Sequence, residues 1–142
     1  MKISGRWVGL AVILLATLPL AAGDMRSVRA NLIAVDGSGA NMGFVKAGGS
    51  GQGGTRILVI GKGLNPSGEY LSLYYDNHVC ELEPYEDDDV IGTYTADMNG
   101  LGKTTRAVED DFDEINSVSI RNASDFSLVA CADLHPGKVV KK

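Results

Sequence analysis

Few side chains in this 142-residue sequence suit catalysis near neutral pH, and they centre on two histidines and two cysteines. Nucleophilic catalysis needs a base beside the nucleophile, and that base is most often a histidine. His78 lies two residues before Cys80 in a turn-like segment, and His135 precedes Pro136 near the C-terminus. Neither histidine has a catalytic partner close to it in the sequence. We therefore expect no catalytic residue and no hydrolase-type triad.

The two cysteines, Cys80 and Cys131, enclose a loop of about 50 residues. They have no CxxC spacing, the arrangement that lowers a thiol pKa in redox proteins, so a redox pair is the weaker interpretation. An even number of cysteines in an exported chain favours a disulfide, and the leader described below indicates export. Closing a loop of this length stabilises a fold by about 4 kcal/mol in the chain-entropy model, before native strain is subtracted.

Carboxylates gather in two runs, Glu81-x-Glu83-x-x-Glu86-Asp-Asp-Asp89 and Glu109-Asp-Asp-x-Asp-Glu114. Oxygen ligands suit calcium, and an exported protein meets millimolar calcium, so a weak calcium-binding adhesion module is one alternative. Neither run has the Asp-x-Asp-x-Asp-Gly order or the sharp glycine turn of a dedicated calcium loop. Solvated loop surface is the interpretation we favour, and we predict no metal site.

Two glycine motifs resemble phosphate-binding loops. Gly49-x-Gly51-x-x-Gly54 matches a dinucleotide fingerprint, but that motif needs a following helix, and here the chain runs into the apolar segment Arg56 to Ile60. Gly102-Lys103-Thr104 has Asp97 where a phosphate loop needs glycine, and a carboxylate would repel phosphate. We expect a hairpin loop at the first motif and no nucleotide or other cofactor.

Residues 1–23 have the order of a secretory signal peptide. A basic N-terminus precedes the apolar run Val8 to Leu20, and small residues follow it up to Gly23, the expected cleavage point. A membrane-spanning helix is the rival interpretation. The run has 13 residues, whereas roughly 20 are needed to cross a bilayer, and Pro19 interrupts it. The sequence therefore predicts a secreted or periplasmic protein with no membrane span after cleavage.

Cleavage after Gly23 leaves 119 residues, enough for one domain with a core of its own. Losing Lys2 and Arg6 reduces the 13 basic residues to 11, against 18 acidic ones, a formal charge of −7. This charge argues against nucleic acid and anionic lipid, which are bound through Lys and Arg. A protein or a small ligand remains as partner. We divide the chain into the leader, a domain at 24–134 and a flexible basic tail at 135–142.

The mature sequence predicts short strands separated by turn residues. In one of them Val118 and Ile120 alternate with polar residues, as in a half-buried strand, whereas Arg56 to Ile60 is apolar enough for a strand covered on both sides. Asn99-Gly100 is a hairpin signal. We expect a flexible loop at Ala47 to Gly54. At Val108 to Glu114 we expect at most a short helical segment, which is too acidic to bury one of its faces. The expected strands are Arg29 to Val35, Asn41 to Lys46, Thr55 to Gly61, Glu69 to Tyr75, Ile91 to Ala96, Lys103 to Val108, Asn116 to Asn122 and Phe126 to Ala132.

The order of several motifs between Ala30 and Leu134 resembles copper/zinc superoxide dismutase. The resemblance implies an all-β fold, an eight-stranded antiparallel Greek-key barrel or sandwich, in which a loop cysteine pairs with a cysteine of the last strand. The motifs are Asn41-Met-Gly-Phe44, Ile57 to Leu64, Asn65-Pro-Ser-Gly68 leading into Tyr70 to Tyr75, Cys80, Gly92 to Asp97 followed by Asn99-Gly100, and Leu128 to Ala132.

The same resemblance exposes departures at the metal site. Ser72 and Tyr74 stand where the family carries a pair of copper-binding histidines, and no histidine lies between Cys80 and Ile91. The family's site draws on six histidines, and this chain has two. The arginine expected shortly before the last cysteine also has no match.

We therefore expect an exported non-catalytic domain, a binding or structural module with an unidentified ligand and no cofactor. A degenerate metal-dependent dismutase is the alternative from the enzyme class. Asn122-Ala-Ser124 is a glycosylation acceptor pattern, relevant only if the source is eukaryotic.

Overall fold

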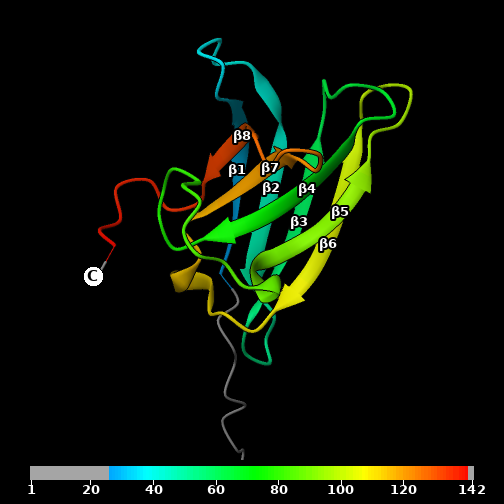
Figure 1. Cartoon of the computed structure of the whole chain (residues 1–142). Coiled ribbons are helices and arrows are strands. Elements are labelled where there is room, and N and C mark those ends of the chain that lie inside the picture. Colours follow the sequence, from blue (N-terminus) through cyan, green and yellow to red (C-terminus); the bar gives the residue numbers. More distant parts are fainter. Residues whose placement is uncertain (1–25, 141–142) are drawn as a thin grey trace, which may run out of the picture.

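The computed structural model describes residues 26–140, so the predicted signal peptide lies outside the described residues (Figure 1). Within that range no helix is long and apolar enough to cross a membrane. The regular elements are eight strands and two short 3-10 turns. Their bounds are β1 (Ser27–Ala34), β2 (Asn41–Gly49), β3 (Thr55–Gly61), β4 (Glu69–Tyr75), η1 (Asp87–Asp89), β5 (Val90–Thr95), β6 (Gly102–Val108), η2 (Phe112–Glu114), β7 (Ser117–Asn122) and β8 (Leu128–Asp133).

All eight strands join one antiparallel sheet in the order β5-β4-β7-β8-β1-β2-β3-β6. The two edge strands, β5 and β6, pack together so closely that a Cβ atom at Gly92 would overlap the Thr104 side chain. The sheet is therefore a nearly closed barrel. The chain crosses from β3 to β4 and from β6 to β7 rather than between neighbours, which gives Greek-key connections. The predicted fold class is confirmed.

The ladder between β1 and β8 is the shortest in the sheet. It pairs Ile33 with Cys131 and Ala34 with Ala130, whereas β2 and β3 pair along seven residues. A register shift between Asn31 and Ile33 bends β1 near this ladder. Cys131 of the last strand therefore lies between this short ladder on one side and the longer ladder to β7 on the other.

The barrel interior is filled by alternating apolar side chains from all the long strands, because successive side chains of a strand point to opposite faces. Val118 and Ile120 of β7 belong to this core, as their alternation predicts. The polar residues that alternate with them, Ser117, Ser119 and Arg121, point to the outer face of the barrel. They are also buried, because the loop after β4 covers this face. The other fully buried large residues of the core are Leu32, Val45, Ile57, Val59, Ile115 and Leu134.

Three local expectations are wrong. In β3, Ile57 and Val59 are fully buried but Leu58 and Ile60 only partly so, and the strand is not covered equally on both faces. Ala47 to Gly49 lies in β2 rather than in a loop. Only Ser50 to Gly54 form the hairpin connection between β2 and β3. The acidic segment before β7 does bury an apolar side chain, because Phe112 of η2 packs on the core.

Candidate binding site at one end of the barrel

Three connections meet at one end of the barrel: the loop at 76–89 after β4, the segment at 109–116 between β6 and β7, and the chain after β8 (Figure 1). A disulfide between Cys80 and Cys131 ties the first of these connections to β8, with the two Cα atoms 5.9 Å apart. The predicted disulfide is confirmed. It holds a loop without regular strand structure against the sheet that positions the rest of the site.

Hydrogen bonds to the backbone of Cys80 hold the same loop from β7. The Cys80 amide donates to Ser117 Oγ at 3.2 Å, and its carbonyl oxygen accepts a 2.7 Å hydrogen bond from Arg121. Arg121 is only 7% exposed, and its Nε donates to the hydroxyl of Tyr75. Its guanidinium group also donates to the Phe126 carbonyl oxygen, so two carbonyl oxygens and a hydroxyl oxygen hold this arginine in place. The alternating polar face of β7 is thus an anchor for the loop.

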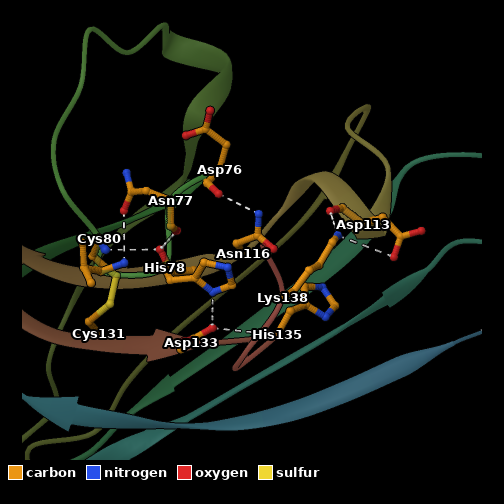
Figure 2. A network of polar contacts seen from close by, with 12 residues as sticks. Asp76, Asn77, His78, Cys80, Asp113, Asn116, Cys131, Asp133, His135 and Lys138 are labelled. Carbon is orange, nitrogen blue, oxygen red and sulfur yellow. Dashed lines mark hydrogen bonds and ion pairs between the residues drawn. A yellow bond between two sulfur atoms is a disulfide. The ribbon is translucent and has the colours of Figure 1, made fainter. Parts of the chain in front are cut away.

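His78, in the anchored loop, has an acidic partner that sequence proximity did not indicate. Its Nδ1 lies 2.7 Å from Oδ1 of Asp133, and the same oxygen accepts a hydrogen bond from the His135 amide (Figure 2). His78 Nε2 is buried and has no hydrogen-bond partner among the residues that the structure describes. His78 and Asp133 are 55 residues apart in the chain, so only the folded barrel brings them together.

The second histidine belongs to a different set of contacts. His135 Nε2 lies 3.1 Å from the carbonyl oxygen of Phe112, and the two rings meet edge to face with centroids 4.7 Å apart. Lys138 then donates to the carbonyl oxygen of Asp113. The segment expected to be a flexible tail therefore contacts η2 as far as Lys138. The two imidazoles do not converge on one point.

The strand positions that the family resemblance assigns to copper ligands face the barrel interior. Ser72 is fully buried and hydrogen-bonds the Tyr94 hydroxyl at 2.8 Å. Tyr74 donates to Oδ1 of Asp110 at 3.3 Å. Burial and the neighbouring Asp110 carboxylate raise the pKa of Tyr74 far above its usual range, so its phenol stays protonated. A protonated phenol is a poor ligand for copper or zinc.

Next to these residues lies a cleft of about 890 Å³ between the three connections. We call it the acidic cleft, because one ammonium group, that of Lys138, faces six carboxylates there. These carboxylates belong to Asp76, Glu83, Asp89, Asp110, Asp113 and Glu114. Each of the two acidic runs of the sequence contributes to it. We expected both runs to be solvated loop surface, and the fold places residues from both of them around one cavity.

Asn116 also lines the acidic cleft, and it is only 4% exposed. Its Nδ2 donates a 2.6 Å hydrogen bond to the carbonyl oxygen of Asp76, which fixes the orientation of the amide. Its Oδ1 is buried and receives no hydrogen bond from any residue in the range 26–140. A buried acceptor without a donor costs about 1–3 kcal/mol, so this oxygen favours a ligand that supplies an N–H group.

The carboxylates of the acidic cleft are spread out. Within residues 26–140, no three histidine, cysteine, aspartate or glutamate side chains converge closely enough to hold a metal ion. Calcium requires six to eight oxygen ligands around one point. The cleft instead spreads its negative charges over two connections, the loop at 76–89 and the segment at 109–116.

The predicted glycosylation acceptor, Asn122, ends β7. Its Nδ2 donates to Ser127 Oγ at 2.8 Å across the β7–β8 turn. A glycan on this nitrogen would have to replace that hydrogen bond.

The whole sequence matches no protein-family model and no curated protein. Solved structures match it. A SOD-like protein from Bacillus subtilis is 14% identical with a TM-score of 0.58, covering 75% of this chain and 97% of its own. A double mutant of a SOD-like protein from the same organism is 12% identical with a TM-score of 0.56, at 75% and 95% coverage. The Cu/Zn superoxide dismutase from Brucella abortus is 14% identical with a TM-score of 0.55, at 78% and 100% coverage. At these identities the likeness concerns the backbone: the chain has the Cu/Zn superoxide dismutase-like barrel.

Proposed function

We propose that this chain is an exported, non-catalytic superoxide dismutase-like domain that binds a ligand at the acidic cleft and does not dismutate superoxide. The observation that carries the proposal is the separation of its two imidazoles. His78 Nδ1 is paired with Asp133, and His135 Nε2 is paired with the Phe112 carbonyl. Within residues 26–140, neither ring belongs to a group of three potential metal ligands.

The residues present do not fit copper and zinc of the dismutase kind. Such copper sites use imidazole nitrogens, which the strand positions at Ser72 and Tyr74 do not supply. His78 Nε2, which has no hydrogen-bond partner among residues 26–140, is enclosed by protein atoms rather than open to a metal. We therefore derive no dismutation step for this chain.

Export is supported by the leader composition and by the disulfide, which persists in oxidising compartments. Expression of the full chain with its own leader in a bacterial host tests this part. N-terminal sequencing of the soluble product from the periplasm is expected to begin at Asp24. Recovery of the chain in the cytoplasm with the leader attached would contradict export.

The metal content of the purified, disulfide-bonded protein tests the loss of catalysis. Copper and zinc are added in excess, removed by gel filtration and measured by elemental mass spectrometry, alongside a dismutation assay. We expect far less than one copper per chain and a rate equal to that of buffer. Stoichiometric copper that survives gel filtration, with a dismutation rate abolished in His78→Ala, would establish the degenerate enzyme instead.

A further inference from the structure

We propose that the acidic cleft binds a small elongated organic cation that carries two or more ammonium groups, as linear polyamines do. This inference rests on the proposed binding function and names the chemical class of its ligand. The cleft volume of about 890 Å³ falls within the range of small-molecule sites. A cation of this class matches the cleft in charge, in hydrogen-bonding groups and in shape.

The charge of the cleft is strongly unbalanced. Six carboxylates line it and Lys138 is the one basic residue among its lining residues. In the described part of the chain, no three potential metal ligands lie close enough together to hold one ion. Charges separated along a flexible molecule can approach carboxylates that lie on different connections. The spacing of the acids therefore favours an extended polycation over a metal ion.

Lys138 already places an ammonium group in the cleft. Its Nζ donates to the carbonyl oxygen of Asp113 and lies 3.9 Å from Oδ1 of the same residue. The Asp113 side chain is 55% exposed and that of Lys138 is 39% exposed, so this contact is weak and open to exchange with a ligand. An incoming ammonium group can take the same two oxygens.

Asn116 adds an independent requirement for a donor. In Figure 2 its Nδ2 points to Asp76, and its Oδ1 points the other way, on the side of Lys138. This oxygen is buried and unpaired. An ammonium group has three N–H donors and no acceptor, so one group can serve Asn116 and a carboxylate at once. An anion or a carbonyl-rich ligand would leave Oδ1 unpaired.

The aromatic lining suits the methylene segments between ammonium groups. Tyr74, Tyr75 and Tyr85 line the same cleft, and Tyr85 is 40% exposed. Aromatic faces attract cations and pack against CH2 groups. A hydrated metal ion offers no apolar surface for these rings.

Titration of the mature protein with spermidine, followed by isothermal calorimetry, tests the proposal. We expect one saturable site. The double variant Asp76→Asn/Glu83→Gln should weaken binding about tenfold, because two charges are removed from the cleft. Neither carboxylate makes a hydrogen bond within the described residues, so the variant should fold normally. The control Glu69→Gln/Glu81→Gln changes the net charge equally outside the cleft and should alter affinity less than twofold.

A second variant tests the role of Lys138. Lys138→Ala removes the competing ammonium group and should tighten spermidine binding severalfold, whereas Lys103→Ala on β6 should not. Absence of spermidine binding, equal losses in both double variants, or tighter binding of calcium than of spermidine would overturn the proposal. Binding of a lysine-rich peptide without binding of spermidine would overturn it too. Each of these results leaves the metal-content test unchanged, so failure here is distinguishable from failure of the proposed function.

Discussion

The guanidinium group of Arg121 donates a 2.7 Å hydrogen bond to the carbonyl oxygen of Cys80. It also donates to the Tyr75 hydroxyl at 2.9 Å and to the Phe126 carbonyl oxygen at 2.6 Å. One buried side chain thus supplies donors to three oxygens from three separate segments. Through these contacts the outer face of β7 determines where the loop at 76–89, and with it one wall of the acidic cleft, is held.

Replacing Arg121 should therefore destabilise the domain. Arg121→Met keeps much of the volume but leaves buried acceptors without donors, and we expect the free energy of unfolding to fall by about 3 kcal/mol. Urea unfolding followed by circular dichroism measures the change. Arg56→Met, at an exposed position of β3, is the control and should change stability by less than about 0.5 kcal/mol. Equal stability of the Arg121 variant and the wild type would show that the guanidinium is not an anchor.

The disulfide should contribute a comparable amount. Closing the loop between Cys80 and Cys131 restricts the unfolded chain, and Cys80→Ser/Cys131→Ser should lower the free energy of unfolding by up to about 4 kcal/mol. Total stabilities of small domains are about 5–15 kcal/mol, so the variant is expected to remain folded but marginal. Wild-type protein with a reducing agent should unfold at the same denaturant concentration as the variant. A midpoint unchanged by reduction would contradict this expectation.

Stability should also decrease at high pH, because burial raises the pKa of Tyr94 to about 12. An unfolded tyrosine has a pKa of about 10. Between these two values the folded protein keeps a proton that the unfolded chain releases, so the free energy of unfolding decreases as pH rises from about 10 to about 12. Below this window Tyr94 contributes no pH dependence. Urea unfolding at several alkaline pH values measures the slope.

The variant Tyr94→Phe separates this effect from others. Its slope between pH 10 and 12 should be smaller, with a remainder from Tyr74, whose pKa is also raised. At neutral pH it should lose about 1 kcal/mol, because Ser72 Oγ loses its buried hydrogen-bond partner. An unchanged alkaline slope would show that the Tyr94 hydroxyl titrates normally in the folded protein.

The contact between His78 and Asp133 can be measured with a double-mutant cycle. His78→Ala, Asp133→Asn and the double variant are compared by urea unfolding at neutral pH. For two partly buried groups 2.7 Å apart, we expect a coupling energy of about 1 kcal/mol. A coupling energy of zero would mean that the two side chains do not interact in solution.

Sequence patterns predicted the strands well because alternation and turn residues are local signals, whereas the barrel was implied by the family resemblance. The alternation of apolar and polar residues placed Val118 and Ile120 in the core. The even number of cysteines, together with the leader that indicates export, predicted the disulfide. Strand ends were displaced by one to three residues where the pattern did not break, as in β2, which continues to Gly49. The last strand was expected from Phe126, but that residue has a positive φ of 63° and lies in the preceding turn.

The candidate site could not be predicted in the same way, because its residues come from distant segments. Asp76 and Glu83 follow β4, Asp113 precedes β7, and Lys138 follows β8. Their assembly depends on the order of strands around the barrel, which no local pattern records. Arg121, a charged residue in a strand with buried neighbours, was the one signal in the sequence that a loop would cover this face.

The sulfur bridge gives oxidation a mechanical meaning. It joins Cys80, in a loop without regular strand structure, to Cys131 of β8. Before the bridge forms, hydrogen bonds with Ser117 and Arg121 of β7 hold this loop. If the chain is exported as we propose, its thiols stay reduced while the polypeptide passes unfolded through a translocation channel. Oxidation after the crossing would then lock the loop onto β8, so that this end of the barrel becomes rigid only after export.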